Sequence, residues 1–160
     1  MPVILDAKRG DIGSTAAQYA IEAFERYGAD AVTLSPYMGR DSIEPFLHRP
    51  GKWAIVLGIT SNAGANDFQF IADANGQRLF EAVIAKCAQW GSPDELMFVT
   101  GATRPELLIQ ARALAPDHFF LVPGVGAAQR RRERLRAVEE RRHQRRHAAL
   151  QGHLPRSSQR

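Results

Sequence analysis

Short apolar runs rich in β-branched residues alternate along this chain with segments whose apolar residues recur every three or four positions. The runs predict five strands, at residues 3–7, 31–34, 53–59, 96–100 and 119–122. Successive strands are separated by roughly 20 to 40 residues, enough for a helical connection. This alternation indicates a parallel sheet whose strands are joined by right-handed helical crossovers.

Three longer segments have the periodicity of amphipathic helices. The first begins at Ser14 or Thr15 and ends at Gly28, the third begins around residues 103–105, and residues 42–47 form a shorter piece interrupted by proline. The apolar positions expected to face the core are Ala16, Ala20, Ala23, Phe24 and Tyr27 in the first helix, Leu79, Val83, Cys87 and Trp90 in the second, and Leu107, Leu108, Ala111 and Leu114 in the third.

Five parallel strands fit two architectures, an open doubly wound sheet or part of a (β/α)₈ barrel. A complete barrel takes about 250 residues, so the 160 residues of this chain favour the open sheet. The loops favour the barrel, because polar residues follow the strands at 6–8, 60–62, 101–103 and 123–126, as the active face of a barrel requires. The first strand also begins with no element before it. The residues thus predict an α/β fold and leave both architectures open.

The composition, 44% hydrophobic over 160 residues, is enough for one compact domain. No apolar run approaches the roughly 20 residues of a membrane span, and the first residues do not resemble an export signal. We therefore expect a cytoplasmic protein without a membrane partner. Cys87 is the only cysteine, which excludes an internal disulfide and predicts a packing role. His48 and His118 lack neighbours at metal-ligand spacing and are interpreted as ordinary loop or surface residues.

The basic character of the chain is confined to its C-terminal end. Residues 129–160 contain eleven Arg and three Glu, a net charge of +8, whereas the whole chain carries +4 and the remainder therefore −4. We expect an α/β domain at residues 1–128 and an Arg-rich tail at 129–160, either disordered or a solvated helix. The tail is either a nucleic-acid arm that binds phosphates non-specifically or an accidental product of out-of-frame, GC-rich coding sequence. The lack of aromatic residues among its charges favours the second.

Asp6 and Lys8, an acidic and a basic residue, lie close together at the end of the first predicted strand. Because strand side chains alternate between faces, Ile4, Asp6 and Lys8 share one face. Such a pair is either a buried structural ion pair or part of a site, because α/β proteins build sites where charged groups end a strand. A third charge, Asp11, and the helix start that follows it favour a site.

Residues 6–15 contain the pattern Asp-x-Lys-x-x-Asp-Ile-x-x-Thr, which resembles the orotidine 5′-phosphate decarboxylase family in its longer bacterial type. The resemblance continues through residues 32–46, 60–62, 98–103 and 121–127. The motif Asp-x-Lys-x-x-Asp alone also occurs in related sugar-phosphate decarboxylases and synthases, whereas the five blocks in this order are specific. The resemblance implies strands three to seven of a (β/α)₈ barrel that converts orotidine 5′-phosphate to UMP and carbon dioxide, with no metal or organic cofactor.

Carried over by position, the resemblance assigns roles to the charged residues. Lys8 is the expected proton donor to C6 of the pyrimidine as carbon dioxide leaves, and Asp6 is expected beside the departing carboxylate. Asp11, with Ile12 and Thr15, is expected to reach into the site of the neighbouring subunit of a homodimer. The chemistry suits Lys8, because an ammonium stabilises the carbanion as it forms and can then protonate it.

The resemblance implies further substrate contacts in two loops. Ser61 resembles a serine that contacts the pyrimidine, although an ordinary loop or helix-capping serine fits the sequence equally well. Pro123, Gly124 and Gly126 resemble a phosphate-binding loop, although most Gly-x-Gly pairs occur in turns. These four residues complete the candidate site.

The match breaks at both ends of the chain. The family's first two strands have no counterpart here, and with them go a ribose-contacting Asp and the first Lys of a Lys-Asp-Lys-Asp array. The expected Gln-Gly-Gly run after residue 127 and a later Asn-Ser-Ser-Arg phosphate-binding segment are also absent. We therefore expect family membership but poor activity from this chain. The alternatives are a sugar-phosphate decarboxylase or synthase and a non-enzymatic nucleic-acid-binding protein.

Overall fold

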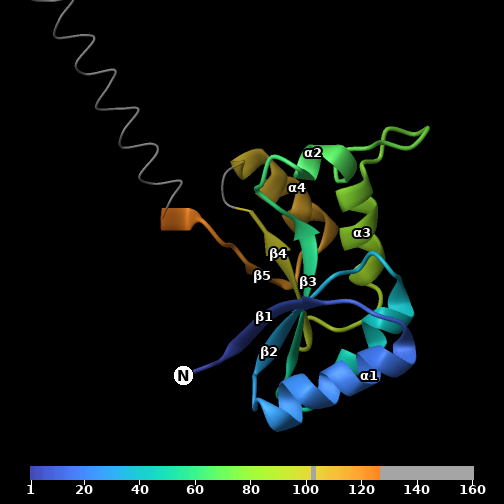
Figure 1. Ribbon diagram of the computed structural model, residues 1–160. Helices are drawn as coiled ribbons and strands as arrows, with labels where there is room; N and C mark the ends of the chain where they lie inside the picture. Colours follow the sequence, from blue (N-terminus) through green and yellow to red (C-terminus); the bar gives the residue numbers. More distant parts are fainter. Residues whose placement is uncertain (102–103, 127–160) are drawn as a thin grey trace, which may run out of the picture. The chain divides into compact units, whose positions relative to one another are not determined.

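The computed structural model describes residues 1–101 and 104–126, and its central element is a five-stranded sheet in which every strand pair is parallel (Figure 1). The strands lie side by side in chain order. They are β1 (Ile4–Arg9), β2 (Ala31–Leu34), β3 (Trp53–Ile59), β4 (Leu96–Thr100) and β5 (Phe119–Leu121). All five predicted strands are therefore present, and β1 continues past its predicted end at residue 7.

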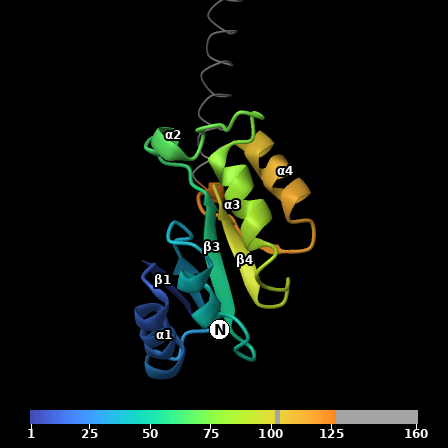
Figure 2. The same cartoon turned by 90° about the vertical axis from the view of Figure 1, so that its right-hand side faces the viewer.

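The connections between the strands are helical. After β1, α1 (Gly13–Ile21) continues into a π-helical turn, η1 (Glu22–Arg26), and after β2 come two 3₁₀ turns, η2 (Arg40–Ser42) and η3 (Glu44–Phe46). The later connections contain α2 (Ala65–Phe68), α3 (Leu79–Cys87) and α4 (Pro105–Leu114). In Figure 2, α3 and α4 lie next to each other beside β3 and β4, with which they are in contact.

The helices pack on one face of the sheet. The main core joins helix side chains to this face, and its members include Ala20, Phe24, Val32, Val56, Ile84, Phe98 and Ala111. A second, smaller cluster contains strand residues alone, with Ala31, Ile55 and Val99 at its centre. A doubly wound sheet carries helices on both faces and reverses its strand order, whereas a barrel keeps chain order and places its helices outside. The predicted partial barrel is confirmed.

The first helix buries Ala16, Ala20 and Phe24 as predicted, but not Tyr27, which is 62% exposed. The reason is the π-helical turn at the end of the helix, where the Tyr27 N–H donates to the carbonyl of Glu22. A turn closed by this wider bond contains an extra residue, so side chains that follow it are rotated away from the face that an α-helix would give them. The prediction for Tyr27 was therefore wrong.

The buried side of α3 begins at Phe80 instead of Leu79, whereas Val83 and Trp90 pack against the core as predicted. Phe80, Ile84 and Cys87 are buried, whereas Leu79 is 41% exposed. Turning the helix this way buries the Phe80 ring, which lies 5.9 Å from the ring of Phe70 between centroids and removes more apolar surface from water than a leucine would. Cys87 packs in the core as predicted, and its burial raises the pKa of the thiol to about 12.

The two histidines differ in their surroundings. His48 is an exposed loop residue, and its Nδ1 lies 3.2 Å from a carboxylate oxygen of Glu95. His118 also lies in a loop, but it is only 7% exposed and its ring packs 5.5 Å from that of Phe98 between centroids. Both histidines therefore lie in loops as expected, but the ring of His118 is turned inward, with its Nε2 3.3 Å from the carbonyl oxygen of Gly91.

The chain divides after Pro123 into two compact units. The first, residues 1–123, contains all five strands, and only residues 124–126 of the second are described. The predicted tail at 129–160 lies outside the described residues, so its predicted boundary and character stay predictions. Among the described residues, no helix has both the length and the apolar character that crossing a membrane requires.

Candidate active site on the open face of the sheet

β1 presents Asp6 and Lys8 on the face of the sheet opposite the helices, which we call the open face, whereas Arg9 pairs with Glu22 on the helix side. Ile4, Asp6 and Lys8 are all exposed there, whereas Leu5 packs against the main core. The predicted alternation is confirmed. The pair is not buried, however, because the side chains of Asp6 and Lys8 are 63% and 51% exposed. Both charges are therefore accessible to a small molecule, and a buried structural ion pair is excluded.

Lys8 has an unusual backbone conformation. Its φ of 47° lies in the left-handed region, which costs a non-glycine residue about 1 to 2 kcal/mol. The register of β1 against β2 shifts between Leu5 and Arg9, and within this stretch the Lys8 N–H donates to Thr33 Oγ1, 3.0 Å away. A side chain of β2 thus takes the place of a carbonyl acceptor. Strained backbone of this kind is concentrated at functional positions.

Asp6 is held between two donors. Lys8 Nζ donates to its Oδ2 at 2.6 Å, and Thr33 Oγ1 donates to its Oδ1 at 2.9 Å. The hydrogen bond from Lys8, followed by that from Thr33, lowers the pKa of the Asp6 carboxyl below its ordinary value. The carboxylate is therefore ionised at neutral pH and forms an ion pair with the Lys8 ammonium.

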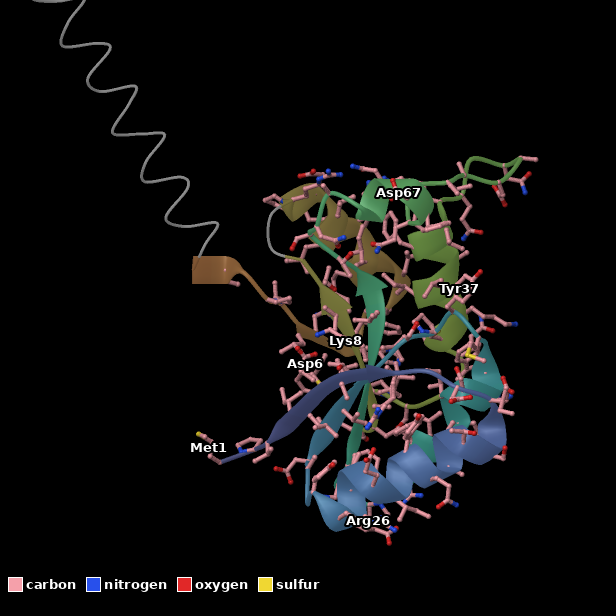
Figure 3. The ribbon with its side chains drawn as sticks, viewed as in Figure 1. Met1, Asp6, Lys8, Arg26, Tyr37 and Asp67 are labelled. Carbon is pink, nitrogen blue, oxygen red and sulfur yellow. The ribbon has the colours of Figure 1, made fainter. Side chains whose placement is uncertain are left out.

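The ion pair borders a cavity of about 500 Å³ on the open face. Figure 3 shows Asp6 and Lys8 close together on β1, the first strand of the sheet order. The polar part of the wall comes from Asp6, Lys8 and the turn after β3. The apolar part comes from strand residues and from Pro123, which follows β5. The lining residues are Ile4, Asp6, Lys8, Leu57, Thr60, Ser61, Asn62, Val99, Leu121 and Pro123. The structure thus brings together Asp6, Lys8, Ser61 and Pro123 of the predicted site.

A family model described as "Orotidine 5'-phosphate decarboxylase / HUMPS family" matches residues 1–145. The chain belongs to this family. The resemblance inferred from the sequence motifs is thereby confirmed.

Curated orotidine 5′-phosphate decarboxylases are similar over most of this chain. The protein of Bacteroides fragilis is 52% identical over 125 residues, which are 78% of this chain and 46% of the relative. The protein of Methylibium petroleiphilum is 61% identical over 132 residues, covering 79% of this chain and 47% of the relative. The chain therefore spans about half the length of the curated relatives that it matches.

Solved structures show the same relationship. The structure of Leishmania donovani OMP decarboxylase matches with a TM-score of 0.74 and 47% identity, over 79% of this chain and 50% of that one. The structure of Leishmania donovani UMP synthase matches with a TM-score of 0.75 and 47% identity, over 80% of this chain and 29% of that one. These matches place the five-stranded sheet within an orotidine 5′-phosphate decarboxylase fold.

Three residues that the family resemblance singled out lie away from the cavity wall. Asp11 Oδ1 accepts a hydrogen bond of 2.8 Å from the Ile12 N–H, and Ile12 is 56% exposed. Among the described residues, the ion pair of Lys8 is with Asp6 and not with Asp11. The helix begins at Gly13, with Ile12 as its N-cap, so the start predicted at Ser14 or Thr15 was slightly late. The roles expected for Asp11, Ile12 and Thr15 in a neighbouring subunit of this family remain predictions.

The predicted glycine loop of the family belongs to the second unit of the chain, apart from Pro123. Gly124 has a φ of 88°, a conformation that favours glycine. Its phosphate-binding role, and that of Gly126, stay predictions. No group of three or more His, Cys, Asp or Glu side chains suited to a metal ion occurs in the part of the chain that the structure describes.

Thr33 is the site residue that the sequence reasoning missed. It is 1% exposed, yet its hydroxyl accepts from the Lys8 amide and donates to Asp6. The only available signal was a polar residue inside the otherwise apolar run of β2. A buried hydroxyl needs partners, so this signal indicated a contact but did not identify its partners on β1.

Proposed function

We propose that this chain carries the catalytic ion pair of an orotidine 5′-phosphate decarboxylase, which converts orotidine 5′-phosphate to UMP and carbon dioxide. The observation that carries the proposal is the ion pair of Lys8 Nζ and Asp6 Oδ2, 2.6 Å apart, on the wall of a cavity that also contains Ser61. The family membership and the names of the curated relatives support the same reaction.

In this proposal Lys8 supplies both charge and proton. As the C6–carboxylate bond of the pyrimidine breaks, carbon dioxide leaves and the electron pair stays on C6. The Lys8 ammonium stabilises that developing negative charge. An N–H bond of the ammonium then breaks as the C6–H bond of UMP forms, and the neutral amine recovers its proton from water. The step requires no metal or organic cofactor.

Asp6 has two roles in this scheme. Its ionised carboxylate orients the Lys8 ammonium through the 2.6 Å hydrogen bond. It also places a negative charge next to the departing carboxylate of the substrate, which raises the energy of the bound ground state relative to the transition state, where that charge has moved onto C6. The low pKa of the Asp6 carboxyl, set by Lys8 and Thr33, keeps it ionised for both purposes.

The remaining predicted residues belong to binding and assembly. Ser61 contacts the pyrimidine from the cavity wall. In the loop that begins at Pro123, the backbone N–H groups of Gly124 and Gly126 approach the phosphate. The exposed Ile12, together with its neighbour Asp11, reaches a second copy of the chain in a homodimer. A cytoplasmic location and a nucleic-acid contact of residues 129–160 stay predictions.

A sugar-phosphate decarboxylase or synthase, the alternative within the same superfamily, is less well supported. The curated relatives reported above are named orotidine 5′-phosphate decarboxylases. We expect weak activity from these 160 residues alone, because they span about half the length of the curated relatives.

The test compares the wild-type chain with its Lys8→Ala variant. Release of carbon dioxide from orotidine 5′-phosphate is measured together with calorimetric binding of UMP. We expect slow turnover by the wild type, none above background by the variant, and UMP binding by both. Equal turnover above background by the two chains would exclude Lys8 as the proton donor.

A chimera separates weak activity from a wrong site. Residues 3–123 of this chain replace the matching segment of the Bacteroides fragilis relative, with and without Lys8→Ala. An active chimera that loses turnover with the substitution supports the proposal. A correctly folded but inactive chimera contradicts it.

A further inference from the structure

The turn after β3, residues 60–62, forms part of the polar wall of the open-face cavity. Both the oxygen and the nitrogen of the Gln69 side-chain amide form hydrogen bonds with this turn. The Thr60 N–H donates to Gln69 Oε1 at 2.9 Å, and Gln69 Nε2 donates back to Thr60 Oγ1 at 2.8 Å. Thr60 Oγ1 then donates to Asn62 Oδ1 at 2.6 Å. The Thr60 hydroxyl has a single proton. Because its oxygen accepts the hydrogen bond from Gln69, the proton is free to be donated to Asn62.

Gln69 is itself fixed by the backbone on either side of it. Its N–H donates to the carbonyl of Ala65 in α2 at 2.9 Å, and its carbonyl accepts from the Phe80 N–H in α3 at 3.1 Å. Through its own backbone hydrogen bonds, Gln69 therefore connects the turn at residues 60–62 to α2 and α3. A glutamine held in this way transmits the position of α2 and α3 to Thr60.

Gly101, at the end of β4, supports the same turn from the opposite side. A Cβ built on Gly101 would lie 2.8 Å from Ser61 Cβ and 3.0 Å from the Ser61 backbone nitrogen, closer than side chains pack. The Gly101 N–H donates to the carbonyl of Ile59 at 3.0 Å, so the backbone of the two strands leaves little room for a shift. Ser61 therefore packs directly against the backbone of Gly101, and a residue with a Cβ would clash with it.

We propose that Gln69 and Gly101 are positioning residues, which hold Ser61 and Asn62 on the cavity wall so that their polar groups meet the hydrogen-bonding edge of a pyrimidine base. A hydroxyl and a carboxamide each donate and accept, and this matches an edge that presents alternating C=O and N–H groups. Holding them in place before binding reduces the entropy that binding has to overcome. The inference rests on the proposed function for the identity of the base.

Gln69→Leu and Gln69→Glu separate the two ends of the amide. Leucine removes both hydrogen bonds. A glutamate oxygen still accepts from the Thr60 N–H, but it offers no donor to Thr60 Oγ1, which then turns its proton to the carboxylate and away from Asn62. Gln89→Leu, at an exposed position after α3, is the matched control.

The first measurement is amide hydrogen exchange in the full chain. We expect Gln69→Leu to speed exchange of the Thr60 amide about tenfold, with other core amides unchanged. Gln69→Glu and Gln89→Leu should leave the Thr60 amide protected. Faster exchange throughout the core of Gln69→Leu would mean that Gln69 has a purely structural role. Unchanged exchange of the Thr60 amide would mean that Gln69 does not hold the turn. Both results overturn the positioning role.

The second measurement is calorimetric binding of UMP. We expect Gln69→Leu, Gln69→Glu and Gly101→Ala to weaken UMP binding about tenfold, and Gln89→Leu to have no effect. Unchanged affinity in the Gln69 and Gly101 variants overturns the inference. If the wild-type chain fails to bind UMP, the proposed function falls, whereas the exchange of the Thr60 amide still decides by itself whether Gln69 positions the turn.

Discussion

The backbone amide of Lys8 lies 3.0 Å from the side-chain oxygen of Thr33, which accepts its hydrogen bond across the irregular pairing of β1 and β2. The same hydroxyl donates to Asp6 at 2.9 Å. One buried side chain therefore supports both the left-handed backbone of Lys8 and the charge of its partner. The strain at Lys8 and the ionisation of Asp6 depend on a residue that takes no part in the proposed chemistry.

Thr33→Val tests this double role. Valine has the same shape, but it leaves the Lys8 N–H without its acceptor and Asp6 without a donor. We expect a loss of about 1 to 2 kcal/mol in the free energy of unfolding, measured by urea denaturation. Thr33→Ser keeps the hydroxyl and is the control. Full stability of the valine variant would show that water replaces the hydroxyl without cost.

Substitutions at Lys8 report on its strained backbone. Glycine relieves the left-handed conformation, whereas alanine keeps it, and both remove the amine. We expect Lys8→Gly to be more stable than Lys8→Ala by about 0.5 to 1 kcal/mol, since the relief exceeds the larger unfolded-state entropy of glycine. Thermal and urea unfolding measure the difference. A more stable alanine variant would argue against strain at this position.

The pH dependence of stability should report on Asp6. The hydrogen bond from Lys8, with the smaller contribution of Thr33, lowers the pKa of the folded carboxyl below its ordinary value of 3.8. The ionised form therefore stabilises the folded state above that value, and the contribution disappears as the pH falls through the folded pKa. The effect is small because Asp6 is exposed.

We expect the stability difference between the wild type and Asp6→Asn to shrink when the pH is lowered below about 4. Urea midpoints at a series of pH values measure it. A difference that stays constant throughout the acid range would contradict the ion-pair assignment.

Gly58 tests the packing of the sheet against α3. A Cβ at this position would lie 3.1 Å from Ile84 Cδ1 and 3.1 Å from the carbonyl oxygen of Val99. We expect Gly58→Ala to lower the free energy of unfolding by about 1 to 3 kcal/mol. Adding Ile84→Val removes one of the crowded methyl groups and should recover part of the loss. Additive effects of the two substitutions would show that the contact is not tight.

Most of the fold was predictable because local pattern and burial agree. The runs at 31–34, 53–59 and 96–100 became strands with the predicted bounds, since apart from Thr33 and Thr100 the residues of these strands are apolar or glycine on both faces. The failures occurred where tertiary packing overrode periodicity. The π-helical turn after α1 exposed Tyr27, and in α3 the ring of Phe80 took the buried position predicted for Leu79.

The sequence alone determined the alternation of strands and helices, the shared face of Asp6 and Lys8, and the family, because these depend on side-chain spacing and on residue identities in order. Only the tertiary structure decided that Thr33 contacts both residues of the ion pair and that Gln69 and Gly101 hold the turn containing Ser61. Such contacts join residues far apart in the chain, and their geometry depends on strand register and helix rotation. Those are set by the packing of the whole sheet, which local spacing does not specify.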